Sequence, residues 1–163
     1  MGWGCGSDTP AENADPGDTP PGDEREEFDN TEKFTAVLQG SESFPDPVTT
    51  DATGLAQFEL SQDGQQLSFE LTVSDIEDAF AAHIHLGARG ETGEIAVFLY
   101  VGDAVTLTGV LAQGTISDTE VVSSAASSLA ELLELIRSGG TYVNVHTNAY
   151  PNGEVRGQIV TGD

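Results

Sequence analysis

The stretch Leu55-Ala-Gln-Phe-Glu-Leu-Ser-Gln-Asp-Gly-Gln-Gln-Leu-Ser-Phe-Glu-Leu-Thr-Val73 decides the fold class of this chain. Its two ends alternate apolar and polar residues, and Asp63-Gly64 between them is the typical turn of a β-hairpin. Because successive side chains of a strand point to opposite faces, the apolar residues of the second end share one face. These residues are Leu67, Phe69, Leu71 and Val73. We therefore expect antiparallel strands over residues 55–60 and 67–73, with their apolar faces in the core.

The β pattern continues through the chain from Phe34 onward. Further strands are expected over residues 34–39, around His83, and over residues 94–101, 105–116, 141–147 and 154–160. Residues 75–78, which are mostly acidic, are expected to form a turn before the His83 strand. Many short strands favour an all-β chain, a β-sandwich with Greek-key connections, over an alternating α/β fold.

One short helix is expected after Ser128. The segment Ser128-Leu-Ala-Glu131 has the pattern of a capping box, and an apolar stripe at helical spacing runs through the residues that follow. The stripe consists of Leu129, Leu132, Leu133 and Ile136. Gly139 and Gly140 are expected to end this helix.

The charge of the chain is strongly acidic. Its 163 residues carry a formal net charge of −23, and the part from Phe34 onward keeps 18 acidic residues against three arginines, a net of −15. A domain so charged repels itself in dilute buffer, whereas molar salt screens charges within about 3 Å. We therefore expect a protein adapted to high salt, with an acidic surface that binds divalent cations as the alternative. Without a basic patch to neutralise phosphates, nucleic acid is not expected as a partner.

Residues 1–33 are expected to form a disordered acidic spacer ahead of one folded domain over residues 34–163, because they hold almost nothing to bury. The only cysteine, Cys5, cannot form an intramolecular disulfide. Its setting, Trp3-Gly-Cys-Gly-Ser7 before a polar segment, looks like the lipidated cysteine of a lipoprotein, with an export signal trimmed or a start codon placed too late. An ordinary free thiol is the alternative reading.

No apolar run is long enough to cross a membrane. A transmembrane segment is therefore not expected, and the setting of Cys5 leads us to expect an extracellular protein held at the cell surface by a lipid anchor.

All three histidines of the chain fall in two of the expected strands. His83 and His85 are two residues apart and would share a face, as would Asn144 and His146. If the two strands are neighbours, the three imidazoles converge as they do in many zinc and copper sites. The alternative is that these histidines only make hydrogen bonds that fix loops. We expect His83 and His146 to be neighbours, and a separation beyond about 8 Å, well over twice a coordination bond, would exclude a three-histidine site.

Four further residues are expected to have mainly structural roles. Glu154 and Arg156 are two apart, so we expect a partly buried ion pair that fixes the register of the last strand. Asn144 is expected to tie backbone together at a strand end. Glu42 is either a fourth metal ligand or the carboxylate of a turn.

Other chemistries find little support. The acidic run at residues 75–78 lacks the ligand spacing of an EF-hand and is expected to be a solvated turn. Cys5 lies in the tail, and no Ser-His-Asp arrangement is indicated, so nucleophilic catalysis is not expected. The glycines at positions 87, 90 and 93 are spaced for turns and not for a phosphate-binding loop.

Three segments together resemble the chordin-type CHRD domain family. The first is Phe34-Thr-Ala-Val-Leu-Gln-Gly-Ser-Glu42 with the prolines and Ala52-Thr-Gly54 that follow it. The second is Ala81-Ala-His-Ile-His-Leu-Gly87 through Gly93, and the third joins Tyr142-Val-Asn-Val-His-Thr147 to Tyr150-Pro-Asn-Gly-Glu-Val-Arg-Gly-Gln158. The chain departs from the family pattern at Phe44-Pro-Asp-Pro47, where a tighter Glu-x-Pro-Pro run is usual.

This resemblance implies an immunoglobulin-like sandwich similar to Cu,Zn superoxide dismutase, in secreted or surface proteins. Chordin, which contains such domains, is an extracellular antagonist of growth factors. The role of the prokaryotic forms is largely undefined. The leading expectation is an exported, non-enzymatic binding or structural module of a halophilic lipoprotein, whose partner is an extracellular protein or a surface polymer. The alternative is a copper- or zinc-binding protein, redox-active like the dismutase. A dismutase site normally uses more than three histidines, which counts against catalysis.

Overall fold

The hairpin around Asp63 is present as expected. The structure, a computed structural model that describes residues 31–162, pairs β2 (Thr53–Leu60) antiparallel with β3 (Leu67–Leu86), and Leu60 lies opposite Leu67. Gly64 adopts a φ of 71° in the turn, a conformation that glycine adopts without steric cost. The expected spacer, including Cys5, lies outside the described residues except at its last three positions. β1 (Lys33–Gln39) begins where that spacer was expected to end.

The strand β3 is longer than the sequence predicts. Residues 75–78 were expected to form a turn, and this prediction is wrong, because β3 continues through them to Leu86. Asp75 and Asp78 adopt positive φ values of 54° and 50° and lie at shifts of the pairing register, so they act as β-bulges. The strands expected over 94–101 and 105–116 are likewise one strand, β4 (Ile95–Ile116), which pairs with β3 along its length.

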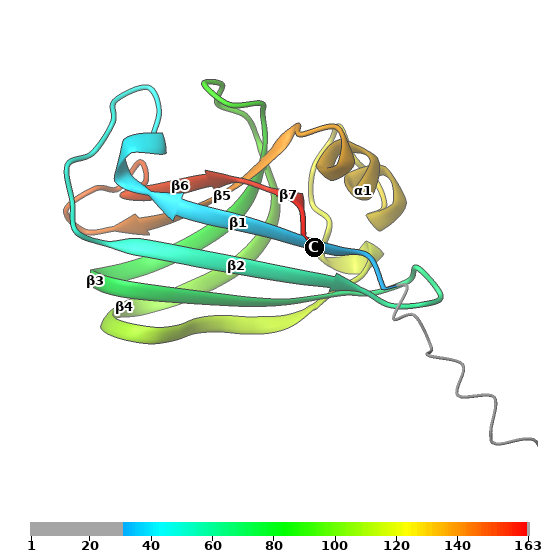
Figure 1. Cartoon of the computed structure of the whole chain (residues 1–163), viewed down its shortest axis with the longest axis horizontal. Helices are drawn as coiled ribbons and strands as arrows, with labels where there is room; N and C mark the ends of the chain where they lie inside the picture. Colours follow the sequence, from blue (N-terminus) through cyan, green and yellow to red (C-terminus); the bar gives the residue numbers. More distant parts are fainter. Residues whose placement is uncertain (1–30, 163) are drawn as a thin grey trace, which may run out of the picture. The chain divides into compact units, whose positions relative to one another are not determined.

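The bulged β3 connects two parts of the sheet. Before the bulges it pairs with β2 up to Ser74, and after them it pairs with β5 (Thr141–Thr147) from Ala79 onward. The strand order is β2-β1-β6-β5-β3-β4, and the additional β2–β3 pairing closes the sheet into a barrel-like form (Figure 1). β6 (Val155–Gln158) lies beside β5, and the short β7 (Val160–Thr161) pairs with β1. The expected all-β fold class is therefore confirmed.

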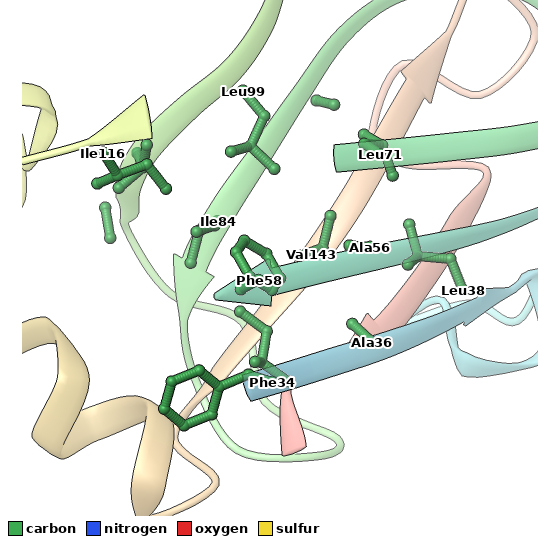
Figure 2. Packing of buried hydrophobic residues seen from close by; sticks show 14 of the residues in the cluster. Phe34, Ala36, Leu38, Ala56, Phe58, Leu71, Ile84, Leu99, Ile116 and Val143 are labelled. Carbon is green, nitrogen blue, oxygen red and sulfur yellow. The ribbon is translucent and has the colours of Figure 1, made fainter. Parts of the chain in front are cut away.

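The core fills the interior of this closed sheet (Figure 2). In β2 every second residue is buried, as the alternating sequence predicts. Large side chains from opposite walls of the sheet meet inside, and each is almost fully excluded from solvent. They include Phe34, Leu38, Leu71, Ile84 and Ile116. Burying apolar side chains of this size stabilises a fold by roughly 1.5–3 kcal/mol each.

The helix α1 (Leu129–Arg137) is the only α-helix among residues 31–162, and it lies at one end of the sheet near β7 (Figure 1). Ser128 caps it by accepting a hydrogen bond from the backbone N–H of Glu131. The Glu131 carboxylate accepts hydrogen bonds from the N–H and the hydroxyl of Ser127. In the expected capping box it would instead accept from the N–H of Ser128, one residue later. All four residues of the apolar stripe are buried. Two short 3-10 turns, at Gly40–Glu42 and Asp118–Glu120, complete the described elements.

No helix in the described part of the chain has the length and apolar character needed to span a membrane.

Candidate three-histidine metal centre

The candidate site lies on the face of the sheet that points away from the core. The pairing of β3 with β5 sets His83 opposite Asn144 and His85 opposite Tyr142. Between them, Ile84 and the β5 valines point into the core and are fully buried, so the polar side chains share the other face. That other face is only partly open to solvent, because Tyr142 and Asn144 are buried although they point away from the core.

The three histidines converge, as their spacing predicts. His83 Nδ1 lies 3.1 Å from His146 Nε2, and the ring centroids of His83 and His85 are 5.4 Å apart. One ligand nitrogen from each ring can be chosen so that all three lie within 4.8 Å of one another. Nitrogens bound at about 2.0–2.1 Å to one tetrahedral zinc lie about 3.4 Å apart. The widest pair therefore needs to close by up to about 1.4 Å around such an ion.

Two of the rings are held by backbone carbonyls. His85 Nδ1 lies 2.9 Å from the Gly93 carbonyl oxygen, and His146 Nδ1 lies 2.8 Å from that of Pro151. A carbonyl only accepts, so both Nδ1 atoms carry the proton and both Nε2 atoms are unprotonated; the lone pair of His146 Nε2 faces His83 Nδ1. A histidine metal ligand is usually oriented in this way, by donating its other N–H to a carbonyl or carboxylate. His85 and His146 thus make the hydrogen bond that is typical of histidine metal ligands.

The loop that supplies one of these carbonyls needs glycine. A side chain at Gly93 would collide with the backbone carbonyl of Leu86, because the loop folds back closely on the end of β3. The same approach lets Leu86 donate its N–H to Glu94 at 3.0 Å and brings the Gly93 carbonyl to His85. Glycine at position 93 therefore allows the close approach of the loop that places the Gly93 carbonyl beside His85.

The imidazoles are neutral in the native protein. Burial, with repulsion from the other two imidazoles, lowers the pKa of His83 to about 4. Burial also lowers the pKa of His85 and of His146, although the carbonyls of Gly93 and Pro151 oppose the lowering. Asn144 opposes it at His85 as well, yet no hydrogen bond joins the two side chains and His85 Nε2 stays buried without a partner. Lone pairs for a metal are therefore present at neutral pH.

Tyr142 links the histidines to an arginine. Its ring stacks on His85 with a centroid distance of 5.0 Å and an interplanar angle of 4°. The guanidinium of Arg156 lies 3.5 Å from the centroid of the same ring. β5 lies between β3 and β6, so Tyr142 connects residues from both neighbours. The contact between Arg156 and the Tyr142 ring is a cation–π interaction, which stabilises by about 0.5–2 kcal/mol.

A cavity of about 320 Å³ opens onto this group. Its walls include His85, His146, Tyr142, Asn144 and Arg156, and Phe44 and Pro45 of the loop after β1 also line it. Two of the three histidines therefore line this cavity, while Phe98 and Phe80 lie against the cluster elsewhere. Phe98 packs edge-on against His83 at 5.1 Å, and Phe80 lies 6.2 Å from His146.

The expected ion pair between Glu154 and Arg156 is absent from the described residues. The Glu154 carboxylate accepts hydrogen bonds from Thr50 Oγ1 at 2.7 Å and from Thr147 Oγ1 at 2.8 Å. Glu154 precedes β6, so the strand alternation on which the prediction rested does not apply to it. This prediction is wrong.

Glu42 lies outside the histidine cluster and pairs with Arg89 at 3.5 Å, so of the two readings the structure shows the carboxylate of a turn. Asn144 was expected to tie backbone together at a strand end. Its Oδ1 is instead buried without a hydrogen-bond partner, although the side chain is only 6% exposed. Tyr142 and its contact with Arg156 were not predicted from the sequence. Tyr142 could have been found, since it alternates with Asn144 and His146 on the same face.

Comparison with known proteins identifies the family. The CHRD domain model matches residues 34–159, which is most of the chain. The chain therefore belongs to the CHRD domain family, and the resemblance drawn from the histidine and Pro-Asn-Gly motifs is confirmed. No match was found among curated proteins.

Proposed function

We propose that this CHRD domain is a metal-binding module that holds one copper or zinc ion through His83, His85 and His146. The observation that carries the proposal is the convergence of three ligand nitrogens within 4.8 Å, with two rings already oriented by backbone carbonyls. Imidazole is a preferred ligand of both metals. Three protein ligands would leave one position of a tetrahedral ion open, and two of the three histidines, His85 and His146, line a cavity.

The setting of this module is a second part of the proposal. We infer an exported, non-enzymatic domain at the cell surface in a salt-rich environment, anchored by lipid at Cys5, whose partner is an extracellular protein or a surface polymer. The net charge of −15 from Phe34 onward supports the salt-rich setting. The polar segment after Cys5 supports the anchor.

A redox role is the second candidate function. It is favoured by the His-x-His pair on β3 with a third histidine on the neighbouring strand, and by a cavity that two of these histidines line. The Greek-key arrangement of Cu,Zn superoxide dismutase, implied by the family resemblance, would go with it. Superoxide removal by the copper-loaded full chain would be measured against the same protein loaded with zinc, and equal rates would exclude this candidate.

The metal proposal is tested by titrating Zn²⁺ and Cu²⁺ into the full chain in molar KCl, where binding to scattered carboxylates is screened. We expect one tightly bound ion per chain. Replacing any of the three histidines by glutamine should weaken binding at least tenfold, since losing a residue that only orients a ligand already costs about 10–100-fold.

The matched control is Glu77→Gln, which removes an exposed acid from the same strand, β3. This variant should bind the ion as the wild type does. Absence of a bound ion in the wild type would contradict the proposal. Equal affinities in all the histidine variants would instead point to binding at the acidic surface.

A further inference from the structure

Arg156 is a buried cation that lacks a carboxylate partner. Arg156 is only 4% exposed, and its guanidinium forms no ion pair with any carboxylate of residues 31–162. Only Nη2 donates hydrogen bonds there, to the Ala88 carbonyl at 3.0 Å and to Gln158 Oε1 at 3.4 Å. Burial lowers the pKa of this guanidinium, which Tyr142 and Glu42 partly offset. Buried charges in proteins are normally paired, so Arg156 is an exception that needs an explanation.

Arg156 lines a cavity, and two other residues that line it have polar atoms without a hydrogen-bond partner. Arg156, Asn144 and His85 all line the same space of about 320 Å³. Asn144 Oδ1 and His85 Nε2 are buried and have no hydrogen-bond partner. A buried cation and a candidate metal-ligating residue thus line the same small cavity. The volume is at the lower end of the range for small-molecule sites.

The chemistry of the walls selects a class of ligand. A guanidinium offers paired N–H groups that match the two oxygens of a carboxylate. The lining of the cavity also includes Phe44 and Pro45, which suit an apolar body and not a fully hydrated inorganic ion. Since the domain carries a net charge of −15, an anion would be repelled from most of its surface, and a local cation is needed to hold one.

We propose that this cavity binds a small organic carboxylate between Arg156 and the open position of the metal held by the histidines. The proposal rests on the proposed metal site, because the ion supplies the second positive charge. The carboxylate lies between the two because Arg156, His85 and His146 all face this cavity. The ligand class is therefore a short-chain monocarboxylate, for which acetate is the simplest probe.

The test uses the full chain loaded with Cu²⁺ and follows the visible absorption of the ion. Sodium acetate is titrated in at constant ionic strength, with weakly coordinating sodium perchlorate as the balancing salt. We expect a saturable spectral change in the wild type and at least tenfold weaker acetate binding in Arg156→Gln, which should retain the copper. Arg137→Gln is the matched control, because it removes the same charge from α1, where Arg137 pairs with Glu32 and Glu134. It should bind acetate as the wild type does.

Each outcome decides the proposal. Copper bound without a response to acetate, or an unchanged acetate affinity in Arg156→Gln, would overturn the carboxylate site and leave the metal site standing. An equal response to sodium chloride would show a site for inorganic anions and would also overturn it. Failure of the wild type to bind copper would overturn the metal site and this inference together. If Arg156→Gln does not fold, Arg156→Lys keeps the charge but loses the paired N–H groups, and full acetate affinity in it would contradict the proposal.

Discussion

His83 shows how burial and metal binding can favour the same protonation state. Its side chain is 8% exposed and touches two other imidazoles, so the charged form is disfavoured and the lone pair is free. His83 Nδ1 donates to His146 Nε2 in the metal-free protein, because the Nδ1 proton of His146 is used by Pro151. Binding an ion at His83 Nδ1 therefore requires only that this one proton leave or move to Nε2.

The lowered pKa of His83 predicts that the metal-free protein loses stability in mild acid. The folded pKa of about 4 lies below the unfolded value of about 6.5, so between these values the unfolded chain binds more protons. The free energy of unfolding should be highest above pH 6.5 and should fall as the pH drops toward 4. This group contributes at most about 3 kcal/mol to that fall.

Denaturant unfolding of the metal-free protein at a series of pH values would measure this. His83→Gln should give a shallower fall between pH 6.5 and 4, because one of the three titrating groups is gone. Carboxylates with a lowered pKa, such as Glu120 at about 2, affect stability mainly at pH values below the pKa of an ordinary glutamate, about 4.3. The fall in stability below that pH should be the same in the variant and the wild type, and it serves as the internal reference. Identical pH curves for the variant and the wild type would contradict the assignment.

At the scale of the element, the bulges in β3 determine which strand the histidines face. Asp75 and Asp78 lie at the point where the partner of β3 changes from β2 to β5. Their backbone N–H groups, which the regular ladder no longer pairs, donate to Thr108 Oγ1 at 2.9 Å and Thr106 Oγ1 at 3.0 Å. The bulges thus let one strand contribute to both parts of the sheet.

Asp78→Val is predicted to destabilise the domain by roughly 1–2 kcal/mol, because a β-branched residue does not tolerate the positive φ of 50°. Asp78→Gly should be neutral or slightly stabilising, since glycine adopts this conformation freely. Glu77→Val is the control, as it removes the same charge next to the bulge without a positive φ. Thermal or denaturant unfolding would measure all three. Equal losses in the two valine variants would show that φ is not the cause.

The elements also show what a sequence can and cannot predict. The 55–73 hairpin and the helix after Ser128 depend on contacts close in the chain, and both were predicted. The turn predicted at residues 75–78 was wrong because aspartates that tolerate positive φ are common in turns and in bulges alike. The histidine cluster followed from spacing along two strands. The Tyr142–Arg156 contact did not, because it depends on β6 lying beside β5, which is a property of the whole sheet.

At the scale of the whole molecule, the acidic surface predicts salt-dependent stability. The net charge of −15 from Phe34 onward should repel itself when unscreened, so the midpoint of thermal unfolding should rise steeply with salt. NaCl and KCl should act alike, because screening depends on ionic strength and not on the cation. Thermal melts from low to molar salt would measure this, and a midpoint that stays flat would contradict adaptation to high salt.

The central claim is that three histidines from two neighbouring strands bind one metal ion. X-ray absorption at the metal edge of the zinc-loaded full chain tests it most directly. The account predicts nitrogen ligands at about 2.0–2.1 Å, with outer-shell scattering that fits three imidazoles. A shell of oxygen ligands alone, without imidazole scattering, would contradict it and would assign the bound zinc to the acidic surface.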